Sequence, residues 1–217
     1  MSPARKNVRS WSKQAGERGR KRKTDTAPAA HAAKITIRSH VLDAMGADQA
    51  HVFDAFAGAG EMHDQVWVRA ASYVGCDLEF YRDDRMAFAA DNLRVLRAID
   101  LAPFNVFDFD GYGSPWEQCV ILAARRPLLP GERLGLVLTE GSGLDMRLRG
   151  LPGVMAYLAG MHPLASGAAR SPDEIIDRCI VGLTRRMRAT VEKRWQAIGK
   201  SGTAMRYIGL VLRRESI

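Results

Sequence analysis

The sequence predicts an α/β domain in which helices cover both faces of a mostly parallel sheet, with an antiparallel hairpin at the C-terminus. Residues 51–60 read as a buried strand that ends in an acid and opens into a glycine turn, and a helix is expected over 62–71. Residues 72–77 read as a second strand ending in an acid. Residues 104–110 read as a further buried strand, which breaks into a glycine-rich turn at 111–116. This doubly wound arrangement predicts a ligand site at the carboxyl ends of the strands.

The other elements are expected from apolar periodicity and from the positions of glycine and proline. They are helices at 34–45, 85–92, 116–129 and 171–188, a strand at 133–140, and a hairpin of strands 190–198 and 205–213. Residues 93–98 are either a third strand ending near Asp100 or a continuation of the preceding helix. The glycine-rich segment 141–170 is expected to be mostly loop, with one short helix near 154–158.

Length and composition favour one intracellular domain. The chain has 217 residues with 47% hydrophobic content, enough for one core, and no apolar run approaches the roughly 20 residues that span a bilayer. The three cysteines form no Cys-x-x-Cys pair and the five histidines no ligand pair, so neither disulfides nor a metal site is indicated. The N-terminus is basic where a secretory signal would be apolar. We therefore expect a cytoplasmic protein without a membrane segment.

The basic charge is concentrated near the N-terminus. Residues 1–34 carry 10 Lys and Arg side chains against Glu17 and Asp25, which matches the net charge of +8 for the whole chain. Residues 1–33 are too poor in apolar side chains to pack a core, so we expect a disordered basic arm followed by a folded domain at 34–217. Such an arm favours contact with a phosphate backbone, although a solubilising tail has the same composition.

The first glycine turn has the features of a nucleotide pocket. Gly58 and Gly60 allow the backbone to approach a ligand closely, and Asp77 at the end of the next strand is placed to accept hydrogen bonds from ribose hydroxyls. His63 stands where the dinucleotide pattern Gly-x-Gly-x-x-Gly has its third glycine, which argues against NAD or FAD. The alternative is a generic buried strand with a tight turn.

The run 51–60 resembles motif I of the class I S-adenosylmethionine-dependent methyltransferases, hydrophobic-Asp-x-Phe-x-Gly-x-Gly, and Asp77 matches the acid of their motif II. The resemblance implies a Rossmann-like class I methyltransferase fold and S-adenosylmethionine as the cofactor. The cofactor-binding residues that it implies are Asp54, Phe56, Ala57, Gly58, Gly60, Asp77 and Leu78. If residues 93–98 form a strand, Asp100 would read the adenine amino group.

The second glycine turn, Asp110-Gly111-Tyr112-Gly113-Ser114-Pro115, resembles motif IV of amino-group methyltransferases. It is closest to the Asp-Pro-Phe/Tyr-Gly-Ser/Thr-Pro form of the tRNA guanosine N2-dimethyltransferases. The resemblance implies that Asp110 accepts hydrogen bonds from the target amine while Tyr112 stacks on the base. Gly111 departs from the family's proline, which puts the reaction and the base in doubt. An ordinary glycine turn, with Asp110 capping the next helix, is the alternative.

The resemblance covers residues 52–144 and implies an enzyme that methylates a base nitrogen in nucleic acid, tRNA or DNA, bound through the arm at 1–33. The sulfonium is already a strong methyl donor, so the reaction requires no metal. Two alternatives stay open. The substrate could be a protein or a small molecule, or Gly111 could mark a protein that keeps the fold and binds nucleic acid without turnover.

Overall fold

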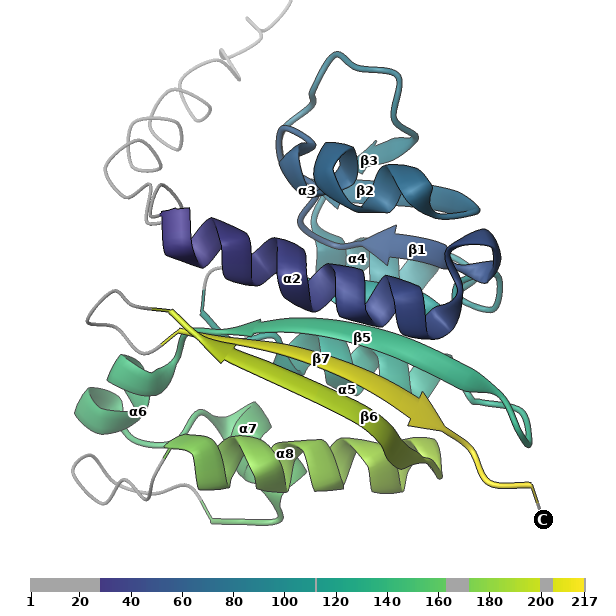
Figure 1. Ribbon diagram of the computed structural model, residues 1–217. Coiled ribbons are helices and arrows are strands. Elements are labelled where there is room, and N and C mark those ends of the chain that lie inside the picture. The colour runs from purple at the N-terminus through teal and green to yellow at the C-terminus, as the bar shows by residue number, and fades with distance from the viewer. Residues whose placement is uncertain (1–27, 112, 163–171, 200–204, 217) are drawn as a thin grey trace, which may run out of the picture.

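A seven-stranded sheet forms the centre of the structure, a computed structural model that describes residues 28–111, 113–162, 172–199 and 205–216 (Figure 1). The strands are β1 (His51–Asp54), β2 (Ser72–Asp77), β3 (Ala87–Ala89), β4 (Val106–Phe109), β5 (Arg133–Glu140), β6 (Thr190–Ile198) and β7 (Arg206–Arg213). Their order is β3-β2-β1-β4-β5-β7-β6. The expected mostly parallel sheet with a C-terminal antiparallel hairpin is confirmed.

The order of strands along the chain switches from one side of β1 to the other. Strands β1 to β5 are parallel, with β2 on one side of β1 and β4 on the other, while β7 pairs antiparallel with both β5 and β6. Connections leave β1 and β4 toward opposite sides, which opens a crevice at their carboxyl ends. We call this end of the sheet the carboxyl edge.

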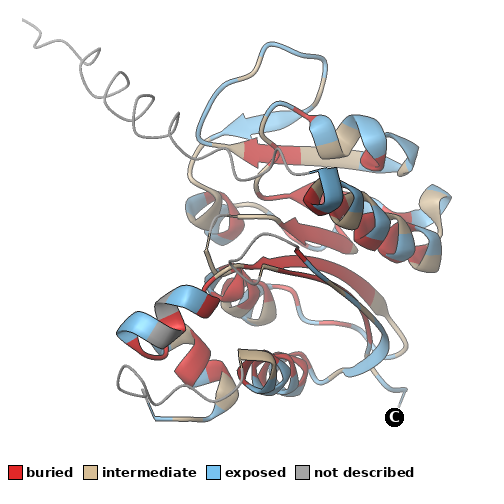
Figure 2. Ribbon diagram, turned by 60° about the vertical axis from the view of Figure 1, so that its left-hand side comes forward, coloured by how far each residue is buried: buried red, intermediate tan, exposed pale blue. Residues whose placement is uncertain are grey.

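Helices cover both faces of the sheet. They are α2 (Pro28–Met45), α3 (Glu61–Gln65), α4 (Asn92–Ala98), α5 (Trp116–Arg125), α6 (Gly143–Arg149), α7 (Gly153–Ala159) and α8 (Pro172–Met187). Helix α2 packs against β5, β6 and β7 on one face, whereas α5 packs against α4, α7 and α8 on the other (Figure 1). Figure 2 shows the buried residues in the central strands and exposed residues along β3 and the loop before it.

Apolar side chains on the two faces of the sheet belong to two separate hydrophobic cores. Phe53, Phe107 and Phe109 belong to the cluster that includes residues of α4, α5, α7 and α8. Val52 and Val106 belong to the cluster beneath α2. Successive residues of a strand point to opposite faces of the sheet. A continuous apolar run therefore buries side chains in both cores, as in parallel sheets generally.

The third strand was predicted wrongly. It is Ala87–Ala89, inside the segment expected to be helical. Residues 93–98 lie in α4, which agrees with the alternative of a helix there and not with the alternative of a strand. Asp91 begins α4, because its side chain accepts a hydrogen bond from the Arg94 backbone N–H at 3.1 Å. Alanine favours helices by intrinsic propensity, but pairing with β2 decides the conformation of this segment.

Several element boundaries also differ from the sequence prediction. Helix α2 begins at Pro28 instead of residue 34, so the segment 28–33 is helical, and residues 1–27 lie outside the described part of the chain. Helix α3 ends at Gln65 and is followed by a 3-10 turn. Helix α5 ends at Arg125, because proline disfavours helical backbone in the residue before it and Pro127 follows closely. The expected loop at 141–170 contains α6 as well as α7.

Cys76, Cys119 and Cys179 are buried and free. Within the described ranges, no helix combines the length and apolar character that a membrane crossing needs, and no group of three or more His, Cys, Asp or Glu side chains is placed to hold a metal ion.

Candidate active site

Acidic side chains gather at the carboxyl edge, because each of four parallel strands ends in or next to an acid. These acids are Asp54 on β1, Asp77 on β2, Asp108 and Asp110 at the end of β4, and Glu140 on β5. Strands β1 and β4 are neighbours, and Asp54 pairs in register with Asp108. The two glycine turns picked out from the sequence therefore start from adjacent strands.

The glycine turn after β1 is bonded to the acid that ends β2. Asp77 Oδ2 accepts a hydrogen bond from the Gly58 N–H at 2.9 Å, and its Oδ1 accepts one from the Glu79 N–H at 2.9 Å. Gly58 and Gly60 have φ values of 46° and 91°, in the left-handed region that favours glycine. The structure thus brings together three of the residues predicted to bind the cofactor.

A small cavity of about 50 Å³ lies beside this turn. Its walls include Ala57, Gly58, Asp77, Phe80, Arg85 and Phe88. Arg85 donates hydrogen bonds to the carbonyls of Ala57 at 3.2 Å and Gly58 at 2.9 Å, and it pairs with Asp83 at 2.6 Å. Leu78 and Phe80, on the segment between β2 and β3, are each 75% exposed. The segment 78–86 therefore contacts the glycine turn through Arg85, while its apolar side chains face solvent.

The Phe56 ring packs directly against Gly111. The Phe56 N–H donates to Asp54 Oδ1 at 3.0 Å, which fixes the start of the turn. Its ring lies where a Cβ on Gly111 would be, because such an atom would come within 2.5 Å of the ring Cζ. Any larger residue at 111, including the proline of the related motif, requires the Phe56 ring to move.

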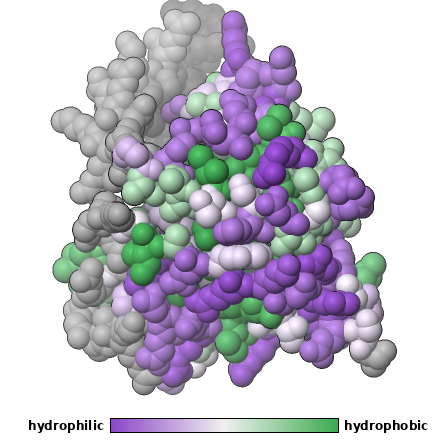
Figure 3. Space-filling model, viewed as in Figure 1, coloured by the Kyte–Doolittle hydropathy of each residue, from purple (hydrophilic) through white to green (hydrophobic). Residues whose placement is uncertain are grey.

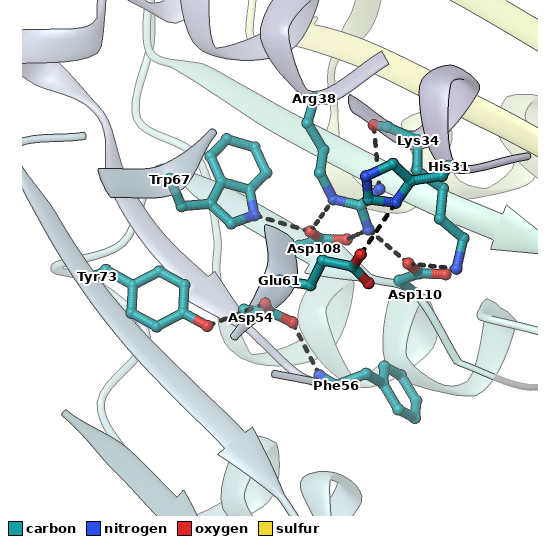
Figure 4. Close-up of polar contacts among 10 residues, drawn as sticks. All are labelled: His31, Lys34, Arg38, Asp54, Phe56, Glu61, Trp67, Tyr73, Asp108 and Asp110. Carbon is teal, nitrogen blue, oxygen red and sulfur yellow. Dashed lines mark hydrogen bonds and ion pairs between the residues drawn. The ribbon is translucent and has the colours of Figure 1, made fainter. Parts of the chain in front are cut away.

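A fully buried ion pair joins α2 to the end of β4. The Arg38 guanidinium donates to Asp108 through Nε at 2.7 Å and through Nη2 at 3.0 Å, and the Trp67 indole N–H donates to the same carboxylate at 2.9 Å (Figure 4). The side chain of Arg38 is 1% exposed and that of Asp108 0%. Burial raises the pKa of Asp108, and the charge of Arg38 opposes this shift.

Asp110 lies on the outer side of this pair. Its Oδ2 is 2.8 Å from Arg38 Nη2 and 3.0 Å from Lys34 Nζ (Figure 4). Burial alone would raise the pKa of Asp110, but the positive charges of Arg38 and Lys34 outweigh it and lower the pKa below its ordinary value. The side chains of Asp110 and Lys34 are 11% and 9% exposed. Asp110 is therefore an ionised hydrogen-bond acceptor at neutral pH, and Tyr112 lies outside the described residues.

Asp54 has the opposite electrostatic character. Burial raises its pKa to about 8, and the nearby charge of Asp108 acts in the same direction. The Tyr73 hydroxyl donates to Asp54 Oδ2 at 3.0 Å, beneath the glycine turn. Asp54 therefore supports the turn from inside the protein, while Asp77 lines the cavity beside the turn.

Asp100 does not belong to this site. It lies on the connection between α4 and β4, where its Oδ1 accepts a hydrogen bond from the Ala102 N–H at 2.9 Å and its side chain is exposed. That connection leads into the amino end of β4, at the opposite edge of the sheet from Asp54 and Asp77. The adenine-binding role of Asp100 depended on the alternative in which residues 93–98 form a strand, and these residues are helical. The acid that follows the true β3 is Asp91, the cap of α4.

The sequence prediction also missed the basic side of the site. Lys34 and Arg38 are one helical turn apart, on the same buried side of α2 as Ile37 and Val41. Two cations on the apolar face of an amphipathic helix indicate buried ion pairs, since buried charges require partners of opposite charge. The sequence also offers a candidate partner for these cations, because Asp108 is an acid inside an otherwise apolar strand.

Comparison with solved structures places this fold among methyltransferases. The N-methyltransferase NodS from Bradyrhizobium japonicum WM9, in complex with S-adenosyl-L-homocysteine, aligns over 93% of this chain and 97% of its own, with 12% identity and a TM-score of 0.56. The 1,6-didemethyltoxoflavin-N1-methyltransferase from Burkholderia thailandensis, with bound 1,6-didemethyltoxoflavin and S-adenosylhomocysteine, aligns over 100% and 94%, with 14% identity and a TM-score of 0.54.

Trm1 from Pyrococcus horikoshii, in complex with S-adenosyl-L-methionine, aligns over 84% of this chain and 54% of its own, with 15% identity and a TM-score of 0.53. No protein-family model and no curated protein sequence matches the chain. At these identities the likeness defines the fold. The chain has the Rossmann-like fold of class I S-adenosylmethionine-dependent methyltransferases.

Replacing Arg38 by methionine should destabilise the protein strongly. The substitution leaves the Asp108 carboxylate buried with the Trp67 indole as its remaining side-chain partner, and breaking a buried ion pair in this way costs about 3–5 kcal/mol. Urea unfolding monitored by circular dichroism measures the change. Arg69→Met is the matched control, because its pair with Asp43 is exposed and such pairs contribute about 0–1 kcal/mol. Equal, small losses in the two variants would contradict the assigned role of Arg38.

Gly111→Ala should destabilise the protein by about 1–3 kcal/mol, because the new methyl group displaces the Phe56 ring. The cost should shrink when Phe56→Leu is introduced as well, since leucine vacates the ring position. Gly153→Ala serves as the control, because its Cβ would meet nothing within 4 Å. Thermal unfolding of the four variants tests the coupling, and additive effects at positions 56 and 111 would rule it out.

Proposed function

We propose that the protein is an S-adenosylmethionine-dependent methyltransferase that methylates a base nitrogen in RNA or DNA. The observation that carries the proposal is the arrangement of two turns on one sheet edge. The glycine turn after β1 is bonded to Asp77, and the neighbouring β4 leads to the ionised Asp110. A cofactor turn and an acceptor carboxylate on adjacent strands are the two parts that methyl transfer to an amine needs.

The residues beside the first turn suit the cofactor. Asp77 is placed to accept hydrogen bonds from ribose hydroxyls, and Leu78 offers an apolar surface to adenine. Gly58 leaves its backbone open to the methionine part, whereas the Arg85 guanidinium fills the space beside Gly60. The bound cofactor would supply an electrophilic sulfonium methyl group. The cavity of about 50 Å³ is smaller than the roughly 300–1,000 Å³ of most small-molecule pockets, so in this proposal the segment 78–86 moves when the cofactor binds. Three fold neighbours were solved with this cofactor or its demethylated product.

Asp110 would act by positioning the target. Arg38 and Lys34 both contact Oδ2, and in this proposal Oδ1 accepts a hydrogen bond from the target N–H. Holding the nitrogen in line with the methyl group is catalysis by proximity and orientation. The lowered pKa makes Asp110 a weak base, so in this proposal the proton released after transfer passes to solvent.

Charge supports nucleic acid as the substrate. The N-terminal 34 residues are strongly basic, and residues 170–217 add 11 Lys and Arg side chains against 5 acids. Both segments favour a polyanion. A base within a duplex would have to be flipped out to reach Asp110. A small molecule is the second candidate, because the Burkholderia neighbour was solved with one bound.

Asp110→Ala should abolish methyl transfer while leaving affinity for S-adenosylmethionine within a few fold. The measurement is incorporation of labelled methyl groups from S-adenosylmethionine into total tRNA, single-stranded DNA and a small-molecule extract. Asp100→Ala is the control and should keep full activity, since Asp100 lies at the opposite edge of the sheet. Equal activity of Asp110→Ala and the unmodified protein would refute the role of Asp110. Labelling of the extract alone would refute the nucleic-acid substrate.

A further inference from the structure

Helices α7 and α8 form an open groove of about 490 Å³ on the face of the sheet opposite α2. Its lining includes Tyr157, Gly160, Arg178, Val181, Arg185 and Arg186. The two helices approach closely because position 182 is glycine: a Cβ there would lie 1.8 Å from the Leu158 carbonyl oxygen. Gly182 therefore sets the close approach of the two helices that line the groove.

Tyr157 and Arg186 form a stacked pair in this groove. The Arg186 guanidinium carbon lies 4.1 Å from the centroid of the Tyr157 ring, and Nη1 donates to the Gly182 carbonyl at 3.1 Å. The Tyr157 side chain is nevertheless 60% exposed. An exposed ring fixed beside a guanidinium offers a stacking surface for a base and a cation for a phosphate.

The groove also carries unbalanced positive charge. Glu174 pairs with Arg178 at 3.1 Å, and Asp177 pairs with Arg194 at 2.6 Å, so each acid of the groove is neutralised. Arg185 and Arg186 have no carboxylate partner within the described ranges. Figure 3 shows the neighbouring face, which carries α2, β6 and α8, as mostly hydrophilic with small separate apolar patches.

The groove starts near the candidate active site. Asp173, in the first turn of α8, forms an ion pair with Arg206, the first residue of β7. Arg206 pairs in register with Glu140 at the carboxyl end of β5. Helix α8 has 16 residues, so the groove can extend up to roughly 24 Å away from the carboxyl edge.

We propose that the α7–α8 groove binds a single-stranded segment of nucleic acid, with a base stacked on Tyr157 and phosphates held by Arg185 and Arg186. An acidic peptide would satisfy the arginines but would leave the exposed ring unused, so the ring favours a nucleobase. The proposal deepens the nucleic-acid part of the proposed function and rests on it for its biological role. Binding itself can be measured without turnover.

The test uses the full chain and a fluorescein-labelled 20-nucleotide RNA of mixed sequence, with affinity measured by anisotropy over a range of salt concentrations. Tyr157→Ala should weaken binding about tenfold at every salt concentration, since the lost stacking of one base is not ionic. Arg185→Ala should weaken binding and lower the slope of log K against log salt by about one. Tyr157→Phe should keep the affinity because the ring remains.

Arg97→Ala is the matched control on α4, where the arginine is exposed and paired with Glu117. It should leave the affinity within twofold. Unchanged affinity for the RNA in both Tyr157→Ala and Arg185→Ala would overturn the proposal. Binding of poly-glutamate as tight as that of the RNA, and unaffected by Tyr157→Ala, would overturn it as well. If these variants bind RNA normally and the protein still methylates RNA, the groove proposal is wrong and the proposed function stands. RNA binding that depends on Tyr157 without cofactor binding would reject the enzyme and keep the groove.

Discussion

The ion pair between Arg38 and Asp108 is the contact on which fold and site both depend. Two charged groups that are buried away from water must be paired and hydrogen-bonded with each other. Here Arg38 donates two hydrogen bonds to the Asp108 carboxylate, and the Trp67 indole N–H donates a third. The pair attaches α2 to the end of β4. It thereby places Lys34, one turn earlier on α2, beside Asp110. The buried cations of α2 therefore set the charge state of Asp110, the acid that follows β4.

Helix α2 links the two halves of the candidate site. Near its start, His31 lies 3.4 Å from Glu61, the first residue of α3, which follows the first glycine turn. Further along, Lys34 and Arg38 hold the acid of the second turn. Phe56 also joins the two turns, since its ring fills the space that Gly111 leaves. The turns after β1 and β4 are therefore in direct contact through Phe56 and Gly111.

Elements with strong local signals could be predicted from the sequence. The strands at 51–54 and 72–77, the helix near 172–187 and the C-terminal hairpin were found because apolar pattern, turns and caps agree there. Strand β3 was missed because Ala87 and Ala89 carry no strand propensity and only pairing with β2 fixes them. Lys34 and Arg38 were missed because their partners lie 70 or more residues away in the chain. The role of Asp100 depended on the alternative in which residues 93–98 form a strand, and these residues are helical.

The most direct test of the methyltransferase assignment is calorimetric titration of the purified protein with S-adenosylmethionine, S-adenosylhomocysteine and NAD, repeated with Asp77→Ala and Asp77→Asn. The account predicts binding of the first two ligands and not of NAD. Asp77→Ala should weaken binding by at least about tenfold, while Asp77→Asn, which keeps an acceptor for the Gly58 N–H, should weaken it less. No binding of either methionine-derived ligand, or equal affinity in Asp77→Ala, would contradict the account.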